Sequence, residues 1–437
     1  MKKQDELEFK NKQSHFEKLF TENKFYTLRG ELEQYLKKDP NHVDCLLKIA
    51  AVYRELKNYS LSESAYIKII QLKPNHPYVY SVYGELLFHV GYLDKAIKQY
   101  DKALSIEKNS FFSLYGKGRA LMQKSDYKEA IKYFKLALKS KPDSEDLINS
   151  IGACYSNLKL YKESSDAYKS ITSKKYKHYI QNTNNYLETL YFLGDRNLFY
   201  NALNDTISKK ILSAKTASIS SHAAVRFEEM DKYSFCNQPL DYIYKRSLTE
   251  DNILNKKDMK NLIDVSNIDT AVSRRQELLE GGKQTSGNIF GETEGEKSLI
   301  TQHFLNIINN EVQNYKLSFS NDCEMISSFP EKYIIRGWLI EIENAGFLKP
   351  HIHDYGWISG SIYLSLPQNR TGDEGNIRFG IEGKDYPNDG KKFPQKIIDL
   401  NMGDIVLFPS SLFHSTIPFN SNQRRITLAF DLIPDKN

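Results

Sequence analysis

The sequence has few cysteines and no long apolar run. Its four cysteines are far apart and form no paired spacing, which argues against a disulfide framework or a cysteine zinc site and favours a reducing compartment; they are Cys45, Cys154, Cys236 and Cys323. No uninterrupted apolar stretch approaches the roughly 20 residues that cross a bilayer. The N-terminal residues also lack the apolar core of a signal peptide. We therefore expect a cytoplasmic protein with no membrane partner.

A strong charge of one sign is missing as well. The net charge is only +5 at pH 7, and the lysines are spread along the chain near acidic residues. This distribution gives no electrostatic footprint for nucleic acid, so we expect no nucleic-acid partner. With 437 residues, 40% of them hydrophobic, the chain is long enough for two or three domains with their own cores.

A period of 34 residues runs through the first half of the chain. Its markers are Pro40, Pro74, Lys108 and Pro142. Ten positions after each marker stands a small residue: Ala50, Gly84, Gly118 and Gly152. An aromatic residue follows later in each unit: Tyr66, Tyr100, Phe134 and Tyr168. Small residues at fixed places let two helices approach closely, and the aromatic ring fills the space beside them.

This pattern resembles the tetratricopeptide repeat, a helix–turn–helix unit of 34 residues. The resemblance implies an α-solenoid, which we expect over residues 1–210, with degenerate units at both ends. Such a solenoid forms a concave groove that holds a peptide or a partner protein. We expect a linker or helical connector over residues 211–274, where "TASISSHAA" is small and polar.

The residues before the last third have two distinct patterns. Residues 296–316 carry apolar side chains at helical spacing, which predicts an amphipathic helix; they are Leu299, Ile300, Phe304, Ile307, Ile308 and Val312. The preceding "GGKQTSGNIF" is rich in glycine and polar residues and is expected to be a loop.

The C-terminal third consists of short β-branched and aromatic runs separated by turn residues. These runs are "KYIIRGWLIEIE", "ISGSIYLSL", "GNIRFGI", "GDIVLFPS" and "RRITLAFDLI". No helical pattern intervenes after residue 317. The pattern predicts an antiparallel β unit, a sandwich or a jelly roll.

Three histidines in this β unit are candidate metal ligands. His351 and His353 are two residues apart, so both side chains point to one face of an extended strand. His414 follows another strand. The three imidazoles, or two of them with the carboxylate of Asp354, would form a facial site with open positions that suits Fe(II). Arg425 and Thr427 share a strand face and can grip a carboxylate.

These segments, over residues 275–437, resemble the 2-oxoglutarate- and Fe(II)-dependent oxygenase superfamily, in the branch fused to tetratricopeptide repeats. The resemblance implies a double-stranded β-helix, with Fe(II) on His351 and His414 and 2-oxoglutarate as co-substrate. Arg425 would pair with its distal carboxylate, assisted by Thr427, and Tyr363 would donate its hydroxyl.

One position departs from the superfamily pattern, which has an acid two residues after the first histidine. That position here is His353, and Asp354 is one step further. Spacing favours His353 as the third ligand, because residue 354 on a regular strand points the other way. A β-bulge would favour Asp354 instead.

We therefore expect a multidomain α + β protein: an N-terminal α-solenoid of tetratricopeptide repeats and a C-terminal double-stranded β-helix. Its expected function is that of a hydroxylase whose repeats bind a peptide or protein. The alternative is a repeat scaffold with an inactive oxygenase-like domain. A metal enzyme that uses no 2-oxoglutarate is a third reading, against which the spacing of Arg425 argues. A small-molecule substrate also stays open.

Overall fold

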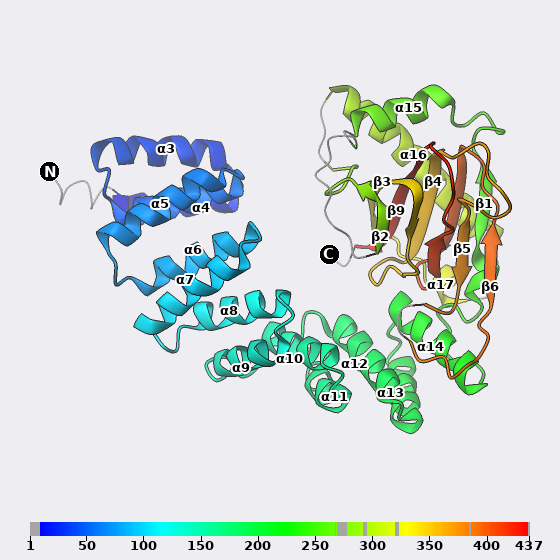
Figure 1. Ribbon diagram of the computed structural model, residues 1–437, viewed down its shortest axis with the longest axis horizontal. Helices are drawn as coiled ribbons and strands as arrows, with labels where there is room; N and C mark the ends of the chain where they lie inside the picture. The colour runs from blue at the N-terminus through cyan, green and yellow to red at the C-terminus, as the bar shows by residue number, and fades with distance from the viewer. Residues whose placement is uncertain are drawn as a thin grey trace. The chain divides into compact units, whose positions relative to one another are not determined.

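The structure is a computed structural model that describes residues 9–266, 268, 278–291, 295–319, 323–383 and 386–435. It divides into two compact units, Met1–Asn182 and Thr183–Asn437. Figure 1 shows the helical first unit in blue and cyan and the second, which contains the strands, in green to red. Among the described residues, no helix combines the length and apolar character needed to cross a bilayer.

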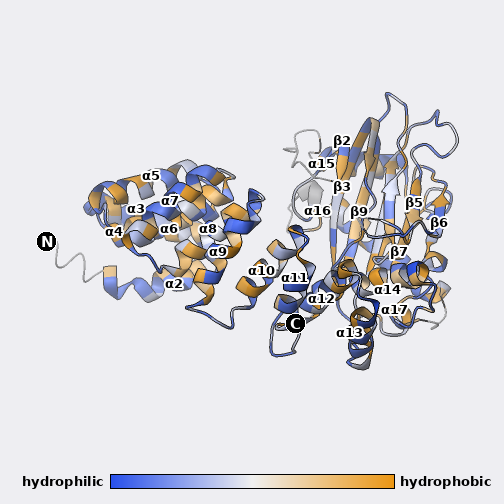
Figure 2. Cartoon of the chain, turned by 60° about the horizontal axis from the view of Figure 1, so that its bottom comes forward, coloured by the Kyte–Doolittle hydropathy of each residue, from blue (hydrophilic) through white to orange (hydrophobic). Residues whose placement is uncertain are grey.

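The first unit is built from consecutive pairs of helices. They are α2 (Gln13–Thr21), α3 (Phe25–Lys38), α4 (Val43–Glu55), α5 (Tyr59–Leu72), α6 (Pro77–His89), α7 (Leu93–Ile106), α8 (Phe111–Gln123), α9 (Tyr127–Leu138), α10 (Glu145–Asn157) and α11 (Tyr161–Lys169). The first helices of four successive pairs begin at residues 43, 77, 111 and 145, which keeps the 34-residue period. Figure 2 shows hydrophobic and hydrophilic residues alternating along these helices. The predicted α-solenoid is confirmed.

The repeated small and aromatic residues pack against each other, as the period predicts. A Cβ atom on Gly84 would lie 2.8 Å from Cε1 of Tyr100, and one on Gly152 would lie 2.9 Å from the ring of Tyr168. Tyr100 and Tyr168 are both buried. Glycine at these positions therefore sets how closely the two helices of a pair approach.

The second unit begins with helices. The boundary between the units falls within α12 (Tyr179–Leu193), which α13 (Arg196–Ser208) and α14 (Ala214–Phe227) follow. The expected end of the solenoid at residue 210 stays a prediction. The boundary expected between residues 274 and 275 lies outside the described residues.

The stretch "TASISSHAA", expected as a linker, is instead part of α14, and that prediction was wrong. Every residue from Ala214 to Ala223 is buried. Alanine and serine side chains are small enough for a helix that is enclosed on all sides. Their low hydrophobicity resembles that of a linker, which explains the error.

Further helices cover the β sheets. They are the 3₁₀ helix η1 (Pro239–Tyr242), α15 (Lys256–Val265), α16 (Gly295–Ser318) and α17 (Glu324–Ser327). The amphipathic helix expected over 296–316 is confirmed as α16, and its buried residues belong to the same core cluster as strand residues. Leu299 does not share that face, because it is 76% exposed.

The strands form two antiparallel sheets. They are β1 (Tyr244–Ser247), β2 (Leu279–Gln284), β3 (Tyr333–Leu348), β4 (Ile358–Ser365), β5 (Ile377–Gly380), β6 (Gln395–Ile398), β7 (Asp404–Pro409), β8 (Phe413–Thr416) and β9 (Arg425–Pro434). The six-stranded sheet has the order β1-β7-β4-β9-β3-β2, and the three-stranded sheet has the order β6-β5-β8. Antiparallel sheets in this arrangement are consistent with a jelly roll, as predicted.

The first part of "GGKQTSGNIF" is not a loop but the end of β2, so that prediction was wrong in part. β2 pairs with β3, with a shift of register between Glu280 and Gly282. Gly281 between them has a φ of +62°, and a Cβ atom there would lie 2.8 Å from Cα of Gly346. Glycine normally weakens a strand, but here it permits a bulge and a close approach of two backbones.

Candidate metal centre and adjoining pocket

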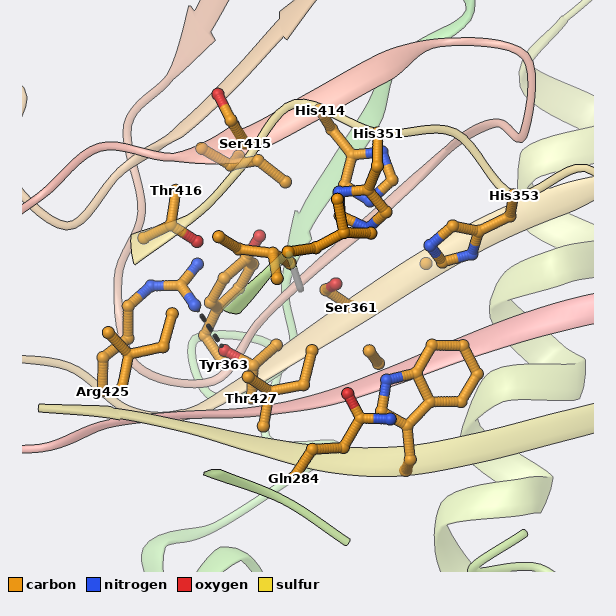
Figure 3. Close-up of a pocket in the computed structure, with 18 of the residues that line it drawn as sticks. Gln284, His351, His353, Ser361, Tyr363, His414, Ser415, Thr416, Arg425 and Thr427 are labelled. Carbon is orange, nitrogen blue, oxygen red and sulfur yellow. Dashed lines mark hydrogen bonds between the residues drawn. The ribbon is translucent and has the colours of Figure 1, made fainter. Parts of the chain in front are cut away.

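A pocket of about 130 Å³ lies inside the β unit. The three candidate histidines and the candidate carboxylate-binding residues Tyr363, Arg425 and Thr427 all line it. Figure 3 shows these side chains around the pocket; they come from β4, β8 and β9 and from the segment between β3 and β4. The fold thus brings these six residues together, whereas Asp354, the alternative third ligand, does not line the pocket.

The three histidines form one cluster. His351 forms an isolated antiparallel bridge with His414, and their ring centroids are 4.2 Å apart. The ring of His353 lies 5.2 Å from that of His351 and 5.0 Å from that of His414. Each residue offers one nitrogen atom within 4.8 Å of those of the other two, so the cluster could hold a metal ion.

Each imidazole is oriented by an oxygen atom that accepts a hydrogen bond from Nδ1. His351 Nδ1 lies 2.8 Å from the carbonyl oxygen of Lys349, and His414 Nδ1 lies 3.2 Å from that of Leu412. His353 Nδ1 donates to the carboxylate of Asp431. Because carbonyl and carboxylate oxygens only accept, the proton is on Nδ1 and Nε2 carries the free lone pair. This is the usual arrangement of histidines that ligate a metal.

The pocket also controls the charge of the imidazoles. Burial lowers the pKa of His351 to about 4, and burial with the neighbouring histidines lowers the pKa of His414 well below its ordinary value. Burial also acts against protonation of His353, but the charge and hydrogen bond of Asp431 outweigh it and raise the pKa. His351 and His414 are therefore neutral at pH 7, as metal ligation requires.

Asp354 does not belong to this cluster. Its carboxylate faces Lys215, with 3.4 Å between Oδ2 and Nζ. Lys215 also lies 2.8 Å from Oε2 of Glu188. Burial disfavours the charge of Lys215, but the two carboxylates outweigh this and raise its pKa. Asp354 is therefore part of an ion-pair network around the buried Lys215, beside the site.

Asp431 is a site residue that was not predicted from the sequence; it holds His353 and accepts a hydrogen bond of 2.7 Å from Ser359. A signal was present: Asp431 lies six residues after Arg425 on β9, so both are on the same strand face. A charged residue within the apolar run "RITLAFDLI" needs a buried partner.

Arg425 is a buried cation at another part of the pocket. Its Nε donates to the carbonyl of Gly375 at 3.0 Å, and its Nη1 donates to Oγ1 of Thr427 at 2.9 Å, the dashed line in Figure 3. The guanidinium carbon lies 5.1 Å from the ring centre of Tyr363. No acidic side chain among the described residues pairs with it. Burial lowers the pKa of Arg425.

Tyr363 adds a hydrogen-bonding group to this end of the pocket. Its buried hydroxyl makes no hydrogen bond within the described part of the chain. Burial raises its pKa to about 12, so the hydroxyl keeps its proton at neutral pH. Arg425 offers a guanidinium without an acidic partner among the described residues, and Tyr363 offers a hydroxyl that is free to donate. This combination suits an anionic ligand.

Family models match both units. Residues 336–431 match the family described as "Putative 2OG-Fe(II) oxygenase", and residues 43–76, 77–110 and 111–144 match tetratricopeptide repeats. The chain joins tetratricopeptide repeats to a 2OG-Fe(II) oxygenase-family domain. The oxygenase-family match contains the three histidines and Asp431. The repeat matches coincide with helices α4 to α9.

Several solved structures are similar to parts of this chain. PilW, a type IV pilus biogenesis factor, is 15% identical with a TM-score of 0.42, and the match covers 48% of this chain and 97% of the PilW chain. A tetratricopeptide repeat protein from Parabacteroides merdae is 13% identical with a TM-score of 0.39, and the match covers 50% of this chain and 86% of that protein. MamA from Desulfovibrio magneticus is 15% identical with a TM-score of 0.35, and the match covers 38% of this chain and 93% of the MamA chain. No curated protein matches the chain.

Proposed function

We propose that the C-terminal domain is an Fe(II)- and 2-oxoglutarate-dependent oxygenase that hydroxylates its substrate. One observation carries this proposal: three imidazoles with free Nε2 atoms share a pocket with a buried guanidinium that has no acidic partner among the described residues. The imidazoles suit Fe(II), and the guanidinium suits a carboxylate. The side chains present therefore fit both groups.

In this proposal each residue has one role. His351, His353 and His414 hold Fe(II) through Nε2. Arg425 binds the distal carboxylate of 2-oxoglutarate, and Thr427 keeps the guanidinium in place through the hydrogen bond to its Oγ1.

Tyr363 donates its hydroxyl to the bound 2-oxoglutarate in the same proposal. Fe(II) with 2-oxoglutarate supplies the activation of dioxygen that hydroxylation needs. The protein contributes orientation and a pocket lined mostly by buried side chains.

Residues that hold the proposed ligands in place support these roles. Asp431 fixes the His353 ring and is itself held by Ser359. A carboxylate that accepts from Nδ1 raises the basicity of the ligating Nε2. His353 is therefore the proposed third ligand in place of Asp354, whose carboxylate pairs with Lys215.

Two alternative functions are less well supported. A scaffold with an inactive oxygenase-like domain does not explain a buried arginine aimed into a pocket beside three oriented imidazoles, because both features cost folding free energy. A metal enzyme without 2-oxoglutarate leaves Arg425 without a ligand.

Tetratricopeptide repeats as a class mediate protein interactions, and we propose that these repeats bind a peptide or protein. Two hollows of about 430 and 350 Å³ occur among the repeat helices. Tyr78 and Val82 line both, so the hollows are neighbours. Aromatic rings there offer rigid contact area to a peptide. The cytoplasmic location stays a prediction.

Succinate formation tests the proposed activity. The full-length protein with Fe(II), ascorbate and 2-oxoglutarate is incubated with cell-lysate proteins and with amino acids, and products are searched by mass spectrometry for the gain of one oxygen atom. We expect Fe(II)-dependent succinate that His414→Ala abolishes and that His303→Ala, a change on α16, leaves intact. Absence of succinate from fully metallated protein would refute the proposal.

A further inference from the structure

A second and larger cavity adjoins the pocket. It has a volume of about 860 Å³, within the range of ligand sites. Gln284, Trp338 and His353 line both the pocket and this outer cavity, so the two spaces meet at these residues. The outer cavity therefore borders the histidine cluster at His353.

The outer cavity lies away from Arg425. Figure 3 shows Arg425 and His353 on opposite sides of the pocket. Asp431, which holds His353, is six residues from Arg425 along β9, roughly 20 Å of extended strand. In the proposed function, 2-oxoglutarate reaches from the histidines toward Arg425. The space that stays open beside His353 is then the outer cavity.

The charged side chains of the outer cavity are not equally available. Its two carboxylates already have partners: Asp431 accepts from His353 and Ser359, and Asp354 pairs with Lys215. Arg336 is exposed and forms no ion pair within the described ranges. Among the charged residues that line the cavity, Arg336 is therefore the one whose charge has no partner within the described residues.

Arg336 is also well placed toward the histidines. It lies opposite Asp431 in the pairing of β3 with β9, and Trp338 follows two residues later on the same strand face. The ring centre of Trp338 lies 5.7 Å from that of His353. A ligand anchored on Arg336 would thus extend over the indole ring to the metal-facing imidazole.

We propose that the outer cavity binds the substrate through an oxyanion, a carboxylate or a phosphate, on Arg336, with the apolar body of the substrate against Trp338. This inference rests on the proposed function, which directs 2-oxoglutarate toward Arg425 and makes the ligand of the outer cavity a substrate. The guanidinium provides paired donors for either oxyanion, and the indole provides a flat apolar surface. Arg336 and Trp338 would thus determine which substrates enter.

Another cavity provides a direct alternative. It has a volume of about 560 Å³ and is lined by His414 and by Arg378. Arg378 on β5 is exposed, like Arg336, and forms no ion pair in the part of the chain that the structure describes. Substituting each arginine in turn therefore distinguishes the two cavities.

Tryptophan fluorescence tests the inference without turnover. The chain has two tryptophans; Trp338 lines the outer cavity, whereas Trp357 is buried and donates to the carbonyl of Met325. The full-length protein is loaded with Zn(II) and saturated with 2-oxoglutarate. It is then titrated with N-acetyl-leucine, N-acetyl-leucinamide, butyl phosphate and butanol. Trp338→Phe serves to assign the signal.

We expect a saturable change in emission with N-acetyl-leucine or butyl phosphate, and the stronger of the two identifies the oxyanion. The uncharged amide and the alcohol should give none. Arg336→Gln should weaken binding by about tenfold or more, whereas Arg378→Gln should change it by less than about twofold. Circular dichroism checks that both variants are folded.

Three results would overturn the inference: equal binding of the acid and the amide, greater loss in Arg378→Gln, or no response to any probe. Because Zn(II) supports no oxygenase turnover, the result is independent of the succinate assay. Binding without succinate formation would refute the proposed oxygenase and leave the oxyanion site standing. Succinate formation without oxyanion binding would support the proposed oxygenase and refute the oxyanion site.

Discussion

The backbones of His351 and His414 are hydrogen-bonded to each other, although the residues are far apart in the sequence. The N–H of His351 donates to the carbonyl of His414 at 3.2 Å, and the N–H of His414 donates to the carbonyl of His351 at 3.0 Å. This bridge holds the two backbones side by side, so both imidazoles start from neighbouring positions. The fold therefore brings two of the three proposed ligands together through main-chain contacts.

The first prediction concerns metal affinity. His351→Ala or His414→Ala should lower the affinity for Co(II), a spectroscopic substitute for Fe(II), by more than about 100-fold, because a ligand is lost. Visible absorption of the Co(II) protein measures this. His303→Ala should leave the titration unchanged. Equal affinity of wild type and His414→Ala would contradict the proposed ligands.

The second prediction separates His353 from Asp354. Asp431→Asn should lower Co(II) affinity by roughly 10- to 100-fold, because Nδ1 of His353 loses its carboxylate partner. Asp354→Asn should change the affinity by less than about threefold, since its carboxylate faces Lys215. A larger effect of Asp354→Asn would mean that Asp354 is the third ligand.

The third prediction concerns Arg425. Arg425→Gln should weaken 2-oxoglutarate binding to the Zn(II) protein by about 100-fold, because the carboxylate loses a buried charge-assisted pair. Isothermal calorimetry measures the affinity. The control ligand 2-oxobutanoate, which lacks the distal carboxylate, should bind wild type and variant alike. A similar loss for both ligands would show that the substitution damages the metal site.

The fourth prediction concerns the pH dependence of stability. His222 on α14 is buried, and its Nδ1 atom lies 2.6 Å from the hydroxyl oxygen of Tyr191. Burial, assisted by Arg226 and opposed by Asp389, lowers its pKa to about 4. The unfolded chain therefore binds a proton between pH 6.5 and 4 that the folded chain does not, so stability falls as pH falls through this window.

The loss from His222 amounts to about 3 kcal/mol at pH 4 and below. Urea unfolding followed by tryptophan emission reports on the second unit, which contains both tryptophans. Between pH 7 and pH 5, His222→Gln should lose less stability than wild type. An identical pH dependence in both proteins would refute the assignment to His222.

The fifth prediction concerns Lys215, whose side chain is 6% exposed. Lys215→Met should lower the free energy of unfolding by about 3–5 kcal/mol, because Glu188 and Asp354 lose their shared cation. Lys209→Met removes a comparable but exposed pair with Asp205 and should cost less than about 1 kcal/mol. Equal losses in the two variants would contradict the network. Thermal unfolding of each full-length variant provides the comparison.

Much of this architecture can be predicted from short-range patterns. The 34-residue period locates the repeat helices because each helix pair repeats the same local packing, such as Gly84 against Tyr100. His351, His414 and Arg425 stand out because polar groups at strand ends are rarely explained by packing. Those residues could be named without knowledge of their spatial neighbours.

The remaining features depend on contacts between distant segments. The glycines of β2 predict a loop, because they disfavour a strand unless a facing glycine, here Gly346, permits the approach. The small residues of α14 predict a linker, because only the elements that enclose them show that they belong to a buried helix. The partner of Lys215 could not be predicted because sequence spacing does not show which buried charges meet.

The ion pairs of Lys215 also determine where the chain can be truncated. A fragment that begins at residue 275 would lack Lys215 and Glu188, and Asp354 would lose its counter-ion. It would also lack β1, which covers the edge of β7. A fragment that begins at Thr183 keeps all of them. We therefore expect the oxygenase-family domain to need α13, α14 and most of α12 to fold on its own.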